Sequence, residues 1–160
     1  DMIGIELGGS IKNVIALAAG ISVGLGCGDN TMAALITRGI TEIARLGIAM
    51  GGRLETFAGL SGIGDLIVTC TSKHSRNHNA GVLIGKGYTM DEAMNEVKQV
   101  VEGVYSAKAA KKLAEKYQVS MPIVSEINEV LFGDLSAKDA LANLLTRDRC
   151  EEYPNDPWQQ

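Results

Sequence analysis

The stretch GIGDLIVTCTSKHSRNHNAG, residues 62–81, changes from apolar to polar within a few positions. Its first half holds one carboxylate, Asp65, among glycine and aliphatic residues. Its second half gathers hydroxyl, amide and cationic side chains just before a helical pattern: Thr69, Thr71, Ser72, Lys73, His74, Ser75, Arg76 and Asn77. Free N–H groups at a helix start favour anions, and arginine adds a planar charged fork. The stretch therefore predicts an anion site, although a solvated polar loop accounts for its composition equally well.

Two isolated charges of opposite sign lie in apolar surroundings. Asp65 is the only charged residue over residues 56–72, and Lys12 is the only one over residues 7–28. The aliphatic neighbours of Asp65 predict that its carboxylate is buried, and a buried charge needs a partner. We therefore expect Lys12 and Asp65 to meet. Such a pair serves either chemistry or structure alone, since structural ion pairs occupy similar surroundings.

Length and composition indicate a single globular domain. The 160 residues are 46% hydrophobic and 21% charged, which suits a chain that buries a sizeable core. The net charge of −4 and the lack of a basic run argue against non-specific binding of nucleic acid. Aromatic residues make up only 4%, so stacking platforms for single strands are lacking as well.

The cysteines and histidines give no metal signal. Cys27, Cys70 and Cys150 are odd in number and form no CxxC motif, so we expect reduced cytosolic thiols that pack in the core. His74 and His78 lie four residues apart without a nearby carboxylate. Surface positions are therefore favoured over a metal site, and no metal is expected.

Both ends of the chain differ from its middle. Residues 1–7, DMIGIEL, alternate and lack an initiator Met, which suggests the end of a strand or linker cut from a longer protein, with a short strand at 2–6. The polar end of the chain predicts a tail at 149–160 after a helical domain at 1–148. The apolar run 14–28, about 15 residues, is too short to span a bilayer, and no signal peptide is seen.

The remaining chain shows helical periodicity and predicts an all-α bundle of six to eight helices. Residues 66–70 are ambiguous because they are short, apolar and β-branched, and a helix is favoured because a strand partner is lacking. Asp29 or Asn30 is the expected cap of the second helix, and Thr89 with Glu92 forms a capping box. The main helices are expected at 10–23, 30–50, 75–84, 89–97, 104–117, 122–132 and 136–145.

Four separate motifs resemble one enzyme family. They are GIELGGSIKNVIALAAGI (4–21), GDNTMAALITRG (28–39), TFAGLSGIGDLIVTCTSKHSRN (56–77) and VVEG (100–103). The chain resembles the C-terminal, substrate-binding domain of bacterial NAD(P)-dependent glycerol-3-phosphate dehydrogenase over nearly its whole length. The resemblance implies a helical bundle like the C-terminal domain of 6-phosphogluconate dehydrogenase. The family's N-terminal Rossmann half is expected to be missing, because no GxGxxG follows a strand.

The resemblance also implies an activity and a site. The family moves a hydride between C2 of sn-glycerol 3-phosphate and NAD or NADP, giving dihydroxyacetone phosphate, in the cytoplasm, and it supplies glycerol 3-phosphate for phospholipid synthesis. Lys12 matches the catalytic lysine. The matching substrate residues are Lys12, Asn13, Asp65, Thr69, Ser75, Arg76 and Asn77, and the matching cofactor contacts are Arg76, Val100 and Glu102. Met32 and His78 stand where the family often has basic residues, away from the matched catalytic positions.

The chemistry of these residue types agrees with the resemblance. Alcohol oxidation needs a group that accepts the hydroxyl proton, and in reverse a protonated Lys12 donates to the carbonyl oxygen. Asp65 favours the charged ammonium and a dry site favours the neutral amine, and the sequence leaves open which prevails.

Two other interpretations remain at this point. One is another β-hydroxyacid-dehydrogenase-like helical domain, such as a ketopantoate reductase type, although the SRN segment argues against it. The other is a helical interaction module without chemistry. The expected partners are a phosphorylated small molecule and the Rossmann domain of the same protein, without which the chain should be inactive. The sequence leaves open the choice of NAD or NADP and the oligomeric state, a homodimer included.

Overall fold

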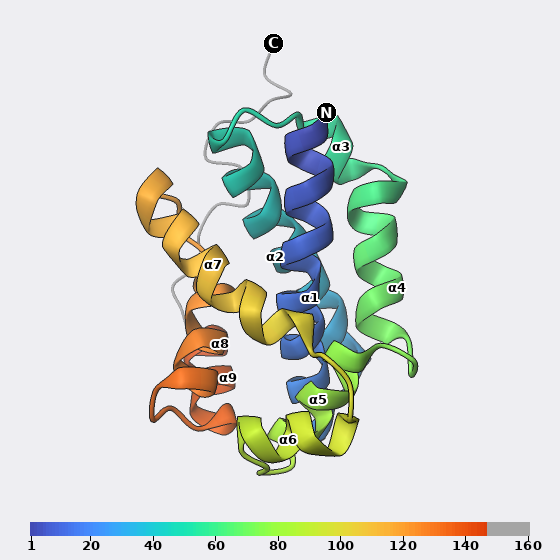
Figure 1. Cartoon of the computed structure of the whole chain (residues 1–160), viewed down its shortest axis with the longest axis vertical. Helices are drawn as coiled ribbons and strands as arrows, with labels where there is room; N and C mark the ends of the chain where they lie inside the picture. The colour runs from blue at the N-terminus through green and yellow to red at the C-terminus, as the bar shows by residue number, and fades with distance from the viewer. Residues whose placement is uncertain (147–160) are drawn as a thin grey trace.

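The computed structural model describes residues 1–146, and this part of the chain is a bundle of α-helices (Figure 1), which confirms the all-α expectation. Residues 1–146 form nine α-helices and one π-helical turn, more than the six to eight helices expected, because one short helix precedes the π-helical turn and another follows it. The predicted tail at 149–160 and Cys150 lie outside the described residues. The elements are α1 (Met2–Gly24), α2 (Asp29–Ala49), α3 (Leu54–Ala58), η1 (Leu60–Gly64), α4 (Asp65–Thr71), α5 (Arg76–Gly85), α6 (Met90–Val97), α7 (Glu102–Tyr117), α8 (Pro122–Phe132) and α9 (Ala137–Thr146).

Helix α1 is the centre of the bundle. It lies between α2 and α4 in Figure 1 and contacts α5, α7 and α8 as well. Its residues are buried on every side over most of its length, as expected of a helix that is apolar all round. By length and composition α1 could cross a membrane, but 72% of its most apolar window is buried inside the bundle, as in the core helix of a globular protein.

The strand expected at residues 2–6 is wrong, because α1 begins at Met2. Asp1 caps the helix, and its Oδ1 accepts a hydrogen bond from the backbone N–H of Gly4 at 2.9 Å. The alternation of apolar residues predicted a strand, whereas the buried positions follow helical spacing. These buried positions are Gly4, Leu7, Gly8 and Ile11.

Two other expected boundaries were tested by the structure. The capping box of α6 is confirmed, with Thr89 and Glu92 each bonding the other's backbone N–H. The expected cap of α2 is wrong, because Gly28 occupies the N-cap position without a side-chain bond and Asp29 is already helical. A negative charge in the first turn still favours the helix dipole, so Asp29 stabilises α2 from within. Residues 66–70 are helical, as favoured, and belong to α4.

Helices α1 and α5 touch backbone to backbone. A Cβ atom at Gly20 would lie 2.0 Å from a carbonyl oxygen of α5, and one at Gly81 would lie 2.2 Å from a carbonyl oxygen of α1. Gly24 and Gly85 repeat this pairing one turn further along. The four-residue spacing of glycine in both helices lets them approach this closely, and it brings the first turn of α5 beside α1.

Candidate functional site

Most of the predicted site residues surround one hollow of 420 Å³ between α1, α4, α5 and the start of α7. Seven of them line it: Lys12, Asn13, Thr69, Ser75, Arg76, Asn77 and Glu102. Asp65 reaches the same place through its bond to Lys12. Val100 does not line the hollow, and its side chain is exposed on the connector before α7.

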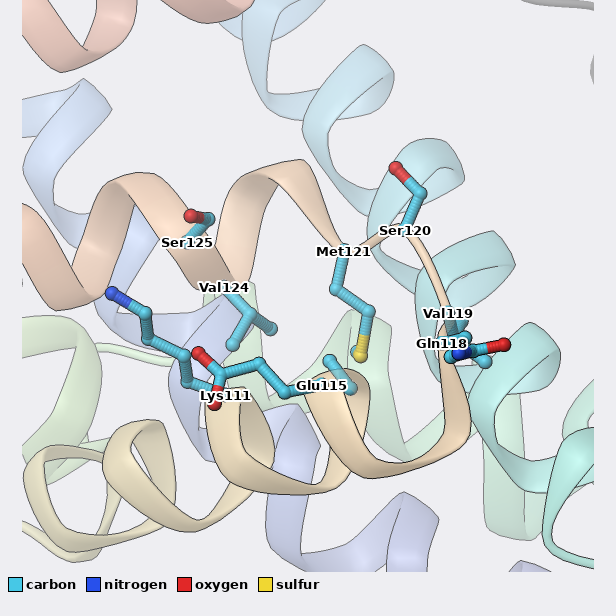
Figure 2. A pocket seen from close by; sticks show the side chains of 9 residues that line it. Lys111, Glu115, Gln118, Val119, Ser120, Met121, Val124 and Ser125 are labelled. Carbon is cyan, nitrogen blue, oxygen red and sulfur yellow. The ribbon is translucent and has the colours of Figure 1, made fainter.

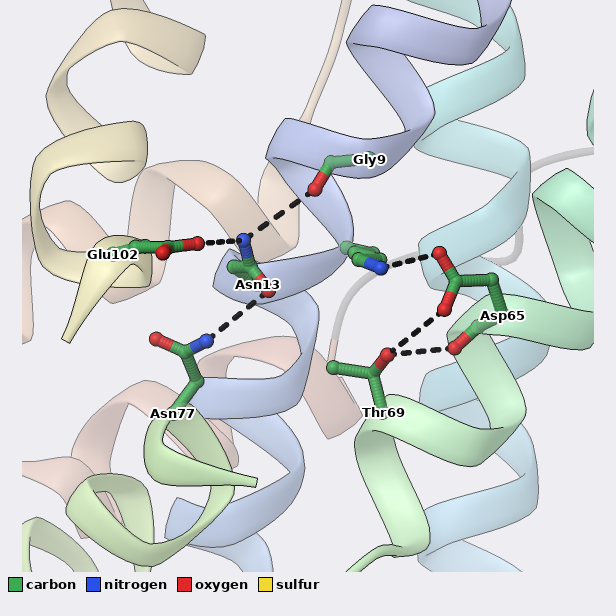
Figure 3. A network of polar contacts seen from close by, with 7 residues as sticks. Gly9, Asn13, Asp65, Thr69, Asn77 and Glu102 are labelled. Atoms are coloured by element: carbon green, nitrogen blue, oxygen red, sulfur yellow. Dashed lines mark hydrogen bonds and ion pairs between the residues drawn. The ribbon is translucent and has the colours of Figure 1, made fainter. Parts of the chain in front are cut away.

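The two isolated charges meet, as the sequence predicted. Lys12 Nζ, on α1, donates to Oδ2 of Asp65, the first residue of α4 (Figure 3). The expected burial of Asp65 is wrong, because 38% of its side chain is exposed, against 23% for Lys12. Leu66 is buried in the core instead, and Asp65 meets the hollow only through its bond to Lys12. An ion pair open to solvent contributes little to stability and leaves Nζ accessible to a ligand.

Thr69 hydrogen-bonds to Asp65 within α4. It lies one turn after Asp65 on α4, and its hydroxyl donates to the backbone carbonyl of Asp65 at 2.7 Å (Figure 3). The same oxygen lies 3.4 Å from Asp65 Oδ1. The short bond of Thr69 is therefore to the backbone of Asp65, its hydroxyl lies near Asp65 Oδ1, and Asp65 Oδ2 is left to Lys12.

The start of α5 gathers groups that suit an anion. Ser75 caps the helix, and its hydroxyl oxygen accepts from the backbone N–H of His78 at 3.2 Å. Arg76 is the first helical residue, and 43% of its side chain is exposed at the hollow. Its Nη2 lies 3.4 Å from Glu102 Oε1. This exposed pair is weak, so an incoming anion can compete with Glu102 for the guanidinium.

Two buried asparagines tie three helices together behind the hollow. Asn77 Nδ2 donates to Asn13 Oδ1 at 3.1 Å, and Asn77 Oδ1 accepts from the backbone N–H of Gly103 at 2.8 Å. Asn13 Nδ2 lies 3.3 Å from Glu102 Oε2 and 3.4 Å from the carbonyl of Gly9 (Figure 3). Both amides therefore brace α1, α5 and the start of α7. A direct contact of either asparagine with substrate stays a prediction.

Sequence reasoning missed part of the lining. Val68 lines the hollow because it follows Asp65 by three residues on one face of α4. That helical spacing was available in the sequence once residues 65–71 were taken as a helix. Ser72 and His74, which the sequence included in the polar stretch without a site role, line the hollow as well. Gly9 also lines the hollow, one turn before Asn13 on α1, and leaves space there.

The histidines separate into one exposed and one buried. His74 is exposed, as expected, but the surface position expected for His78 is wrong because only 9% of it is exposed. His78 lies on the face of α5 that meets α1, where its carbonyl abuts Gly20. Burial lowers the pKa of His78, and a hydrogen bond with the backbone of Cys70 opposes that effect. Among residues 1–146, no group hydrogen-bonds its Nδ1.

Acid is expected to destabilise the fold through His78. Because burial lowers its pKa from the usual 6.5, an unfolded chain binds a proton below about pH 6.5 that the folded chain does not. Stability should therefore fall as the pH falls from about 7.5 to about 5.5, and melting temperatures at both pH values measure this. His78→Asn should flatten that dependence, whereas the matched His74→Asn should preserve it. This account would be contradicted if the stability of His78→Asn fell with pH as steeply as that of the wild type.

Neither described thiol lines the hollow, and the described residues form no metal-binding cluster. Cys70 is fully buried, and burial raises the pKa of its thiol to about 12, so it stays protonated. Cys27 is half-buried, and neither thiol forms a disulfide. Within residues 1–146, no cluster of three or more histidine, cysteine, aspartate or glutamate side chains could hold a metal ion.

Two other hollows lie on the surface. One of 530 Å³, between α5 and α6, shares His74 and Arg76 with the first but does not include Lys12. Another of 340 Å³ lies between α7 and α8 (Figure 2). It is lined partly by Lys111, whose pKa is raised by a 2.8 Å bond to Glu129. None of the nine predicted site residues lines the hollow between α7 and α8.

Comparison with known proteins gives consistent matches along the chain. The family described as NAD-dependent glycerol-3-phosphate dehydrogenase C-terminus matches residues 1–142. Glycerol-3-phosphate dehydrogenase (NAD(P)+) of Agathobacter rectalis is 65% identical over 159 residues, which cover 99% of this chain and 47% of that protein. The Fusobacterium nucleatum relative of the same name is 61% identical over 149 residues, 93% of this chain and 44% of the relative.

A solved structure agrees in fold. Glycerol-3-phosphate dehydrogenase from Coxiella burnetii matches with a TM-score of 0.90 at 46% identity, over 92% of this chain and 45% of that one. The chain therefore spans about half the length of the curated relatives and of the solved structure that it matches.

Proposed function

Since this chain belongs to the family of C-terminal domains of NAD-dependent glycerol-3-phosphate dehydrogenases, we propose that it supplies the substrate site of such an enzyme. The reaction interconverts sn-glycerol 3-phosphate and dihydroxyacetone phosphate. One observation carries the proposal: Lys12, which is paired with Asp65, lines the same hollow as Ser75 and Arg76 at the start of α5. A phosphorylated two- or three-carbon alcohol has a hydroxyl group for Lys12 at one end and a phosphate group for the helix start at the other.

The phosphate would bind at the start of α5. The N–H groups of a helix's first turn have no partners within the helix and favour negative charge there. Arg76 adds a guanidinium whose fork matches the oxygens of a phosphate group, and Ser75 adds a hydroxyl at the same corner. Binding energy from this corner would orient the remote reacting carbon, which raises the rate of the chemical step.

The reacting carbon would lie at Lys12. During oxidation the neutral amine accepts the proton of the C2 hydroxyl, and during reduction the ammonium donates to the carbonyl oxygen. Asp65 orients Nζ through its Oδ2, and Thr69 holds Asp65 in turn. These groups move a proton and stabilise charge on oxygen, and the nicotinamide cofactor supplies the hydride chemistry when it is bound.

The rim of the hollow fits a cofactor held mostly by another domain. Arg76 and Glu102 offer a cation and a carboxylate, and Val100, outside the hollow on the connector before α7, offers an apolar side chain that is 59% exposed. We propose that an N-terminal Rossmann domain, as the partner half of the enzyme, holds NAD or NADP against this rim. The proposal places the enzyme in the cytoplasm, where its product would serve phospholipid synthesis.

A thermal-shift experiment on the 160-residue chain tests the proposal. Glycerol 3-phosphate should raise the melting temperature, inorganic phosphate should raise it less, and glycerol should leave it unchanged. Saturation at about 100 times Kd stabilises a protein by about 2.7 kcal/mol. Arg76→Ala should lose most of the response, because a charged hydrogen bond contributes about 1.5–3 kcal/mol. Equal responses to glycerol and glycerol 3-phosphate, or an undiminished response in Arg76→Ala, would contradict the proposal.

A further inference from the structure

Asp65 directly follows a π-helical turn. The turn η1 spans Leu60–Gly64, and its only buried residue is Gly62. Such turns are rare and occur often at functional sites. A Cβ atom added at Gly62 would lie 2.1 Å from the carbonyl oxygen of Phe57 and 2.5 Å from its Cα. The turn therefore packs directly on the backbone of Phe57, with no room for a side chain between them.

Phe57 cannot move to make that room. Its side chain is only 1% exposed, and its ring lies over two other glycines. A Cβ atom at Gly47 of α2 would lie 2.1 Å from the ring, and one at Gly8 of α1 would lie 3.9 Å from it. Phe57 is thus held between the two long helices. Because interiors are close-packed, an added atom at position 62 must displace the turn and not the phenylalanine.

We infer that Gly62 is a positioning residue for the reaction proposed above, acting through Asp65. Because Gly62 has no side chain, the turn can pack directly on Phe57, and Asp65, three residues later, is positioned to contact Lys12. Displacement of the turn would carry the carboxylate away from Nζ while leaving the start of α5, which binds the phosphate in our proposal, in place. The inference rests on the proposed function, because it assigns Gly62 to the Lys12–Asp65 end of that site.

Gly64 provides a matched control within the same turn. A Cβ atom at Gly64 would have Leu60 Cδ2 as its nearest neighbour at 3.4 Å, which is an ordinary contact. Leu60 is 90% exposed, so its side chain can move aside. Neither Gly62 nor Gly64 has a positive φ, so alanine suits the backbone at both positions. The two substitutions differ mainly in the space around the new methyl group.

The test compares Gly62→Ala, Gly64→Ala and Asp65→Asn in the full-length dehydrogenase. Gly62→Ala should lower kcat by about ten-fold or more, since small misplacements at a reacting centre are costly. It should also alter the pH dependence of kcat in the same direction as Asp65→Asn. Inhibition by inorganic phosphate should stay within about three-fold of wild type, because the α5 corner is untouched. Gly64→Ala should keep kcat within about two-fold.

Distinct results would overturn the inference. The inference would be overturned if folded Gly62→Ala kept the kcat and the pH dependence of the wild type. It would also be overturned if Gly62→Ala and Gly64→Ala lowered kcat equally. If Gly62→Ala does not fold, Phe57→Leu loosens the same support while keeping Gly62, and it should show the same loss of kcat and altered pH dependence. Normal kinetics in Phe57→Leu would then overturn the inference. Failure of the proposed function itself would instead show as unaltered kinetics in Asp65→Asn.

Discussion

Lys12→Ala in the full-length dehydrogenase is expected to lower kcat on the order of 100-fold or more, with a smaller effect on KM for glycerol 3-phosphate. The reason is that a positioned acid or base contributes typically 10²–10⁴-fold to a rate, about what its removal should cost. The substitution leaves Arg76 and the proposed phosphate site at the start of α5 unchanged, so we expect the substrate still to bind. Steady-state kinetics in both directions measure the two constants separately.

An exposed lysine elsewhere gives the matched control for this substitution. Lys112 lies on the solvent side of α7, away from the hollow, and Lys112→Ala removes the same charge. Its kcat should stay within about two-fold of wild type, as expected of surface substitutions. If Lys12→Ala kept a near-normal kcat and only raised KM, Lys12 would be a binding residue and the proposed proton transfer would be wrong.

Gly81→Ala is expected to destabilise the fold strongly. The new Cβ would lie 2.2 Å from the carbonyl oxygen of Leu17 and 2.9 Å from the backbone nitrogen of Ile21. Both atoms belong to the backbone of the central helix, so neither can rotate away. Alanine favours a helix by about 1 kcal/mol over glycine, but overpacking costs about 1–3 kcal/mol and more where backbone is involved. Urea denaturation of the 160-residue chain measures the net loss.

The control for Gly81→Ala is a helical glycine with free space. Nothing lies within 4 Å of a Cβ at Gly9, in the middle of α1, so Gly9→Ala should stabilise the chain by up to about 1 kcal/mol. Both substitutions add one methyl group, but they should change the free energy of unfolding in opposite directions. A Gly81→Ala chain as stable as wild type would show that α1 and α5 can separate at little cost.

The pairing of Lys12 with Asp65 could be predicted because each was alone in an apolar stretch, so each had one available partner. Its exposure could not be predicted, because the direction of Asp65 depends on the π-helical turn before it. In that turn Gly62 packs closely on the backbone of Phe57, a contact that sequence spacing does not reveal. The apolar neighbours of Asp65 predicted burial, whereas a π-helical turn interrupts the α-helical period before it and 38% of its side chain is exposed.

Other misreadings also have physical causes. The alternation at residues 2–6 mimicked a strand because exposed Ile3 and Ile5 sit on the solvent side of α1. His78 looked like a surface residue because its neighbours are polar, but the glycine contacts between α1 and α5 bury it. Both errors arose where tertiary packing decided which side of a helix faces the core.

The most direct test of the proposed site is a crystal structure of the full-length dehydrogenase with dihydroxyacetone phosphate and reduced cofactor. The account predicts the carbonyl oxygen at about 2.6–3.2 Å from Lys12 Nζ, which is hydrogen-bond reach. It also predicts the phosphate at the start of α5 with Arg76 against it. The account would be contradicted if the ligand lay in another hollow, such as the one between α7 and α8, with Lys12 still paired to Asp65 and touching no ligand atom.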